Sequence, residues 1–254
     1  MRYLPLGIIV CLIAGPVFAD KDPKSQERAR LRTELAAAYF TRGQFGIALE
    51  EIQNALSVDA EYAPAFNVQG LIYSELKEDD KAEESFRKSL QLDAQDSNAN
   101  HNMAWFLCNK KRKYAEAGVY FRNALKNPLY STPEKSLYSA GICAARSGEM
   151  GEAGDWFSRA LRLKPNDPQL LFASAELAYK RQQYELAKQY IGQMGKLTKA
   201  SPEVMLLHIR VERRLGNKEL ETALSEQLRR QFPDSSEVKM LNDAQSDQYT
   251  STIK

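Results

Sequence analysis

Residues 70–93 read GLIYSELKEDDKAEESFRKSLQLD, and this stretch holds the pattern that decides the fold of the chain. A small residue, Gly70, stands twelve positions before Ala82, and a large one, Phe86, follows Ala82 by four. A second small residue, Ser89, follows Phe86 by three. Residues spaced by three and four share one face of a helix. The stretch therefore predicts two consecutive helices that cross where their side chains are small.

The same pattern recurs along the chain at spacings of 34, 35, 36 and 34 residues, in the alanine series Ala48, Ala82, Ala117, Ala153 and Ala187. The large residue four positions later is Ile52, Phe86, Phe121, Phe157 or Ile191, and the small residue of the preceding helix is Ala36, Gly70, Ala104, Gly141 or Ala175. A period of 34 with paired helices is typical of tetratricopeptide repeats, which the chain resembles from about residue 28 to residue 233. We expect an all-α fold, a right-handed α-solenoid of about six helix-turn-helix repeats.

Three places depart from this pattern. One extra residue falls in the basic turn of residues 110–113 (KKRK), and two fall within residues 127–133. The basic turn is interpreted as a solvated loop, with a contact to an acidic partner as the alternative. The sixth repeat has Glu221 at the alanine position and Ser225 at the aromatic position. Polar residues there fit a capping repeat whose outer face meets water.

The first nineteen residues predict a secretory signal peptide, because a basic Arg2 precedes an apolar stretch that ends in Val17-Phe18-Ala19. The apolar stretch is interrupted and shorter than the roughly 20 residues of a transmembrane helix. A lipoprotein signal is the alternative, although Pro16 stands where the acylated cysteine is needed. We expect an exported protein without a membrane span in the mature chain, with a polar segment at 20–27 and a polar tail at 234–254.

Composition narrows the classes of function. The chain has 35 Lys+Arg and 33 Asp+Glu, a formal net charge of +2, which argues against nucleic acid as a partner. It has only two His and three Cys, and no stretch outside the repeats is long enough for a catalytic domain. We therefore expect no catalytic residue, no cofactor and no metal, and hence a protein that is not an enzyme.

The first helix of each repeat lines the concave surface of such a solenoid. The residues that face this surface lie three positions before and one after each small residue. We predict a protein-binding groove from Asn67, Leu71, His101, Trp105, Tyr138, Ile142, Phe172 and Glu176, with Tyr179 one turn beyond. Aromatic side chains offer large contact area at little conformational cost, which suits a peptide groove. A place in the core is the alternative for each of them.

Cys108 and Cys143 remain after Cys11 is assigned to the signal peptide. They lie on the first helices of adjacent repeats, which pack side by side. A cysteine pair in an exported chain favours a disulfide, and two free buried thiols are the alternative.

A longer match narrows the family. Residues 100–108 (NHNMAWFLC), 121–125 (FRNAL), 128–130 (PLY) and 141–145 (GICAA) are similar to the PilW/PilF family of type IV pilus biogenesis and stability proteins. The resemblance implies six repeats, a periplasmic location at the outer membrane, and a role in pilus formation and twitching motility. It implies a pilotin-like action on the pilus secretin, with secretin and other pilus components as partners. Some members carry a disulfide at both cysteine positions. Members are lipoproteins, and this chain departs from them in its lipobox.

Two binding functions follow from these patterns. The first is a non-catalytic periplasmic scaffold that promotes secretin assembly or localisation by binding protein in its concave groove. The alternative is a general periplasmic co-chaperone or an adaptor of another envelope assembly or export machine, because the fold suits either.

Overall fold

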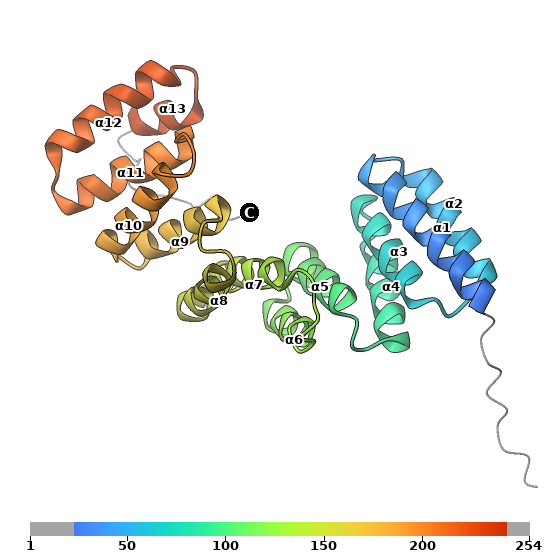
Figure 1. Ribbon diagram of the computed structural model, residues 1–254. Helices are drawn as coiled ribbons and strands as arrows, with labels where there is room; N and C mark the ends of the chain where they lie inside the picture. The colour runs from blue at the N-terminus through green and yellow to red at the C-terminus, as the bar shows by residue number, and fades with distance from the viewer. Residues whose placement is uncertain (1–22, 243–254) are drawn as a thin grey trace, which may run out of the picture.

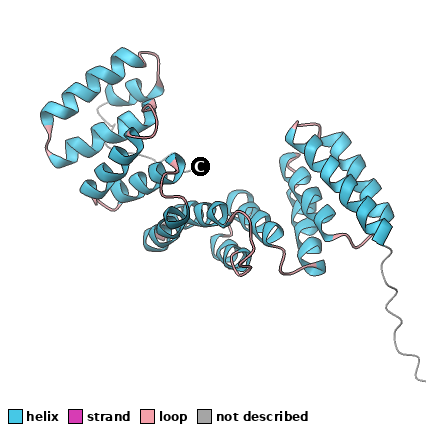
Figure 2. Ribbon diagram, viewed as in Figure 1, coloured by secondary structure: helices cyan, strands magenta, loops and turns pink. Residues whose placement is uncertain are grey.

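The computed structural model describes residues 23–242, which form an elongated, curved array of helices (Figure 1). Short loops join the helices, and residues 23–242 contain no strand (Figure 2). The first helices of the six repeats are α1 (Pro23–Thr41), α3 (Ala63–Glu75), α5 (Ser97–Phe106), α7 (Pro133–Ser147), α9 (Pro168–Lys180) and α11 (Pro202–Leu215). The second helices are α2 (Phe45–Val58), α4 (Asp79–Leu92), α6 (Tyr114–Ala124), α8 (Met150–Leu163), α10 (Tyr184–Gly195) and α12 (Lys218–Gln231). The predicted all-α solenoid of six repeats is confirmed.

Close packing within each repeat explains the small residues of the pattern. A Cβ atom added to Gly70 of α3 would lie 2.6 Å from the Phe86 ring of α4. A Cβ atom added to Gly141 of α7 would likewise clash with the Phe157 ring of α8, and both rings are fully or almost fully buried. The small residue therefore lets the aromatic ring of the second helix reach the backbone of the first.

A left-handed residue reverses the chain between the two helices of every repeat. The six residues are Gly43, Lys77, Arg112, Gly148, Gln182 and Gly216, with φ of 72°, 62°, 54°, 89°, 60° and 80°. Three of them are not glycine, and they occupy a conformation that costs L-residues energy. The turn geometry is thus kept even where the sequence does not favour it.

The extra residue of the third repeat forms a π-helical turn, η1 (Leu107–Lys111), at the end of α5. The π-helical turn ends just before Arg112, the left-handed residue between the two helices of this repeat. The insertion therefore widens the end of the first helix and does not lengthen the connection between the helices. The two other extra residues lengthen the loop 125–132 between α6 and α7. Both insertions flank α6, as the spacing predicted.

The C-terminal end differs from the expected polar tail. A seventh pair is begun by α13 (Ser236–Asn242), whose Val238 is buried against Met205 and Ile209 of α11 and Leu228 of α12. Helix α13 therefore covers apolar side chains of α11 that would be exposed to water without it, because they lie on the side that a further repeat would occupy. Val238 and Leu241, three residues apart, were the sequence signal for this helix.

The N-terminal boundary also moves. Helix α1 begins at Pro23, so the segment 20–27, expected to be polar and outside the solenoid, includes the first turn of the fold. The predicted signal peptide, residues 1–19, lies outside the described residues. Among residues 23–242, no helix combines the length and apolarity that crossing a bilayer needs.

Candidate protein-binding surface

The nine predicted groove residues divide into two groups by exposure. Leu71, His101, Trp105, Tyr138 and Phe172 are partly exposed, whereas Asn67, Ile142, Glu176 and Tyr179 are buried. Tyr179 packs on Tyr184 of α10, with ring centroids 5.6 Å apart, as part of the core. The second group therefore offers little surface to a partner, and the side chains of the first group are the ones that remain accessible.

Asn67 connects two repeats. Its Oδ1 atom accepts a hydrogen bond from Asn102 Nδ2 at 3.0 Å, which ties α3 to α5. This bond satisfies a polar side chain that is otherwise buried between the helices. Asn67 therefore acts mainly in stacking the second repeat on the third.

His101 is held in a packed position. Its Nδ1 atom lies 2.8 Å from Ser136 Oγ of α7, and the Ser136 hydroxyl donates to Tyr130 Oη at 3.1 Å. Its ring packs edge-on against Phe121, with centroids 5.9 Å apart. Burial, with a smaller effect of Lys135, lowers the pKa of His101 to about 4. The imidazole is therefore neutral near pH 7 and links three successive helices.

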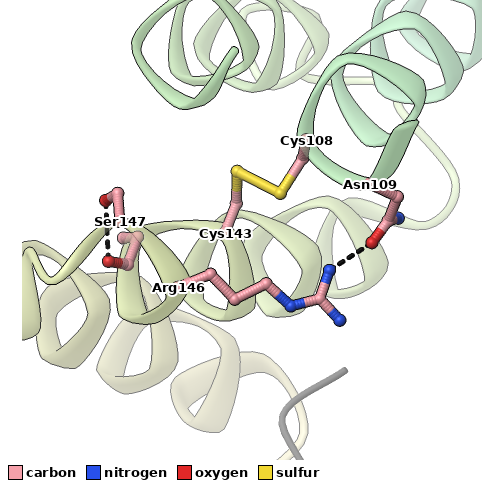
Figure 3. Close-up of a disulfide and its surroundings, with 6 residues drawn as sticks. Cys108, Asn109, Cys143, Arg146 and Ser147 are labelled. Atoms are coloured by element: carbon pink, nitrogen blue, oxygen red, sulfur yellow. Dashed lines mark hydrogen bonds between the residues drawn. A yellow bond between two sulfur atoms is a disulfide. The ribbon is translucent and has the colours of Figure 1, made fainter. Parts of the chain in front are cut away.

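Trp105 lies beside a cation that the sequence pattern did not predict. The Arg146 guanidinium carbon is 5.6 Å from the centre of the Trp105 ring, a distance typical of a cation–π contact. Arg146 also donates to Asn109 Oδ1, from α7 to η1 (Figure 3). Burial lowers the pKa of Arg146, which still stays charged at any physiological pH.

Tyr138 and Glu176 continue this surface from α7 to α9. The Tyr138 ring packs on Phe157, with centroids 6.0 Å apart. Burial raises the pKa of Tyr138, and Glu176 adds to that effect. Burial lowers the pKa of Lys180, while Glu176 acts in the opposite direction. The surface therefore joins aromatic rings to partly desolvated charges.

The residues that the prediction missed share one position in the repeat. Asn109, Arg146 and Lys180 each follow the small residue of their helix by five, one turn beyond the positions used for the prediction. A helical turn of 3.6 residues brings them to the same face. Arg146 and Lys180 thus add two cationic groups one helical turn beyond the aromatic positions.

A disulfide joins the third and fourth repeats. Cys108 of η1 and Cys143 of α7 are bonded, with their Cα atoms 6.0 Å apart (Figure 3). Both cysteines are buried. The bond and the Arg146–Asn109 pair connect the same two segments, so the relative position of α5 and α7 is fixed twice.

Two lysines of the basic turn 110–113 pair with carboxylates of the same chain. Lys111 Nζ donates to Asp80 Oδ1 at 2.8 Å, and Lys113 Nζ lies 3.5 Å from Glu83 Oε1. Both carboxylates belong to α4. The turn therefore connects the second repeat to the third through two of its four basic side chains.

Residues 23–242 group no three His, Cys, Asp or Glu side chains that could hold a metal ion. Arg146, Asn109, Trp105 and Tyr138 make an arrangement of packed rings and charges without a nucleophile beside a base. What this surface offers chemically is contact area and charge, which suits recognition of another chain.

Comparisons with known proteins agree with this architecture. The tetratricopeptide-repeat family matches residues 63–96 and 110–168. The type IV pilus assembly protein PilF of Pseudomonas aeruginosa is 26% identical over 93% of this chain and 94% of its own length. The crystal structure of PilW, described as a widely conserved type IV pilus biogenesis factor, superposes with a TM-score of 0.76 and 30% identity. That match covers 84% of this chain and 97% of PilW.

A solved structure of Pseudomonas aeruginosa PilF superposes with a TM-score of 0.75 and 24% identity, over 86% of this chain and 98% of that one. These matches run along nearly the whole length of the relatives, so the likeness extends beyond a generic run of repeats. The chain belongs to the PilW/PilF family of tetratricopeptide-repeat proteins.

Proposed function

We propose that this protein is a non-catalytic periplasmic scaffold for type IV pilus biogenesis. It binds a segment of the outer-membrane secretin, or of another pilus component, in its concave groove and so promotes secretin assembly or localisation and pilus stability. The named roles of PilF in pilus assembly and of PilW in pilus biogenesis support the pathway. The helical-repeat fold supports binding to protein partners rather than catalysis.

One observation carries the choice of the groove. Trp105, Tyr138 and Phe172 come from the first helices of three successive repeats, and each is partly exposed while it also packs against the buried core. Rigid aromatic side chains of this kind are the usual anchors of a protein interface. The disulfide and the Arg146–Asn109 pair hold the third and fourth repeats in a fixed relative position before a partner binds.

The charges beside the rings indicate the chemistry of the bound segment. Arg146 and Lys180 are cationic and partly desolvated, so a carboxylate placed between the repeats would gain from both. An extended segment with apolar side chains and at least one carboxylate is the partner that fits. This requirement distinguishes the secretin segments that should bind from those that should not.

The test is recovery of the detergent-solubilised secretin on immobilised protein. We expect the combined variant Trp105→Ala, Tyr138→Ala and Phe172→Ala to lose at least about tenfold in affinity, because three aromatic anchors are truncated. The matched control is Val119→Ala, Leu186→Ala and Leu220→Ala, which truncates three exposed aliphatic residues on second helices. Circular dichroism melting checks that both triple variants remain folded.

Unchanged recovery of secretin by the aromatic triple variant would remove the groove from the mechanism. Normal piliation and twitching in a deletion strain would instead favour the co-chaperone or adaptor function in another envelope machine. Loss of piliation with a retained secretin level would assign the protein to a later step of pilus formation.

A further inference from the structure

Three exposed leucines lie on one edge of the solenoid. Leu129, Leu163 and Leu197 are 87%, 52% and 43% exposed, and each stands at or just beyond the end of a second helix, namely α6, α8 or α10. Leu163 and Leu197 stand ten residues after their repeat alanines, and Leu129 stands twelve after its own, within the lengthened loop 125–132. Leu129 is the most exposed large apolar side chain among the described residues.

The most exposed of the three is presented by an ordered loop. Asn127 Oδ1 accepts from the Leu129 amide at 2.9 Å, and the Tyr130 amide donates to the Asn127 carbonyl at 3.2 Å. The next side chain, Tyr130, is buried and bonded to Ser136. The loop is therefore anchored on both sides of a leucine that points away from the core.

Neighbouring loops on this edge are joined to one another. Lys164, which follows Leu163, pairs with Glu134 at the start of α7 at 3.4 Å. Gln193 near the end of α10 donates to the Pro165 carbonyl at 2.9 Å. The three leucines thus belong to one continuous edge rather than to three independent loops.

The same edge has an excess of positive charge. Residues 125–132, 162–167 and 196–201, which we call the leucine edge, contain five basic residues and one acidic residue, a net charge of +4. The acidic one, Asp167, caps the N-terminus of α9 through the amides of Gln169 and Leu170. No described carboxylate pairs with Lys126, Arg162, Lys196 or Lys199.

The corresponding loops of the first two repeats have the opposite sign. Residues 59–62 and 93–96 contain four acidic residues and no basic one. Although the whole chain is nearly neutral, positive and negative charges are therefore separated along one side of the solenoid. That side is acidic over the first two repeats, and it is basic with exposed leucines over the third to fifth.

We propose that the leucine edge docks on an anionic phospholipid surface. Exposed leucines at or beyond helix ends match an interface in which apolar side chains enter the acyl boundary and cations meet phosphate headgroups. Leu163 and Leu197 are directly flanked by Lys or Arg, and Lys126 precedes Leu129 by three residues. A protein partner would instead be expected to bury such leucines in a concave, apolar setting, whereas here they are exposed at or beyond the ends of helices. The docked edge leaves the concave aromatic surface free to bind protein.

The test uses vesicles of phosphatidylcholine with and without phosphatidylglycerol. Leu129→Trp and Leu163→Trp report insertion by quenching of tryptophan fluorescence with brominated acyl chains, measured as the difference from the natural chain with Trp105 and Trp156. We expect quenching only in the vesicles that contain phosphatidylglycerol. Leu76→Trp, exposed at the turn between α3 and α4, is the matched control and should not be quenched.

Co-sedimentation with the same vesicles measures the size of the effect. Each Lys near an anionic surface contributes about fivefold in binding, so Lys196→Gln with Lys199→Gln should weaken association about twenty-fivefold. Leu129→Glu should weaken it at least about tenfold. Lys110→Gln and Val119→Glu are the controls outside the leucine edge and should change little. Because every variant keeps the natural N-terminus, any attachment there is common to all of them.

Equal quenching at Leu129→Trp and Leu76→Trp, or equal quenching with and without phosphatidylglycerol, would overturn the proposal. Vesicle association that is unaffected by the leucine and lysine variants would do the same. Loss of secretin binding in Leu129→Glu, with unchanged vesicle binding, would assign the leucine edge to a protein partner instead. The aromatic triple variant of the groove should bind vesicles normally, so failure of the groove proposal and failure of this one are separate results.

Discussion

The third and fourth repeats (α5–α8, here the central repeats) and the sixth repeat with its cover (α11–α13, here the terminal repeat) depart from the common pattern in different ways. In the central repeats a disulfide joins Cys108 to Cys143. In the terminal repeat, Lys188 Nζ of α10 lies 3.0 Å from Oε1 of the fully buried Glu212 of α11, and His208 Nε2 lies 3.2 Å from the same oxygen. Successive repeats are thus tied covalently in one place and ionically in the other.

The two regions also reverse the order of side-chain sizes. The central repeats place Gly141 on the first helix and Phe157 on the second. At the same positions the terminal repeat places Ile209 and Ser225, both buried. The large side chain at the helix crossing can therefore come from either helix, provided that the total side-chain volume is kept, as is general for hydrophobic cores. The two regions together show that the pattern is one of complementary volumes rather than of particular residues.

The disulfide has the largest expected effect. Cys108→Ser with Cys143→Ser should lower the free energy of unfolding by about 3–4 kcal/mol, because the bond closes a loop with a sequence separation of 35. Urea denaturation with and without reductant measures it. The double variant should be insensitive to reductant, whereas Lys188→Gln at the ionic tie should remain sensitive. An unfolding free energy equal to that of the natural chain would contradict the structural role of the bond.

Acid should affect the central repeats more than the terminal repeat. The folded pKa of His101, about 4, lies below its unfolded value of 6.5, so the unfolded chain takes up the proton first. Stability is therefore complete above pH 6.5 and falls as the pH decreases toward 4, by about 3 kcal/mol in total. Burial also lowers the pKa of His208, but Glu212 opposes that shift.

Unfolding free energy measured from pH 7 to pH 4 checks this difference. His101→Gln, which can keep a hydrogen bond to Ser136, should remove most of the slope. His208→Gln should leave most of it. The reverse order would place the acid-sensitive contact in the terminal repeat.

Substitution to alanine should separate the two packing orders. Gly141→Ala forces a methyl group into the Phe157 ring, and Ile209→Ala leaves a cavity between α11, α12 and α13. Each should cost about 2 kcal/mol, the first by overpacking and the second by lost burial. Thermal melting measures both. Phe157→Leu should restore part of the stability of Gly141→Ala, and an additive loss in that double variant would argue against the ring contact.

The turns should show the smallest effect, with opposite signs in the two regions. Arg112 in the central repeats and Gly216 in the terminal repeat both have positive φ. Arg112→Gly should stabilise the chain by about 1 kcal/mol, and Gly216→Ala should destabilise it by a similar amount. A Cβ at Gly216 would meet no atom within 4 Å, so the cost there is purely conformational. Urea midpoints that shift in the same direction for both variants would contradict this conformational origin.

Much of the repeat architecture followed from spacing alone. The alanine series located both helices of each repeat, and the irregular spacings located the two insertions around α6. The spacing did not reveal that one insertion is a π-helical turn, because one extra residue fits a longer turn or a wider helix equally well. The family followed from residues 100–145, where motif and spacing agree.

The predicted groove was less complete. Helical periodicity put Trp105, Tyr138 and Phe172 on one face, but it could not separate them from Ile142 and Glu176, which the neighbouring helices bury. It also missed Arg146, whose role depends on Asn109 and Trp105 in another repeat. Burial depends on what a neighbouring repeat contributes, and a single-helix pattern contains no such information.

The sequence by itself determined the period, the pairing of the helices and the positions where side chains must be small. These features are local consequences of helical geometry, repeated about every 34 residues. Only the tertiary structure decided how the ends are closed and which faces remain accessible. The cover of Met205 and Ile209 by Val238, the cation beside Trp105 and the leucine edge all arise between segments that stacking brings together. Stacking converts a one-dimensional repeat into distinct surfaces, and those surfaces carry the proposed functions.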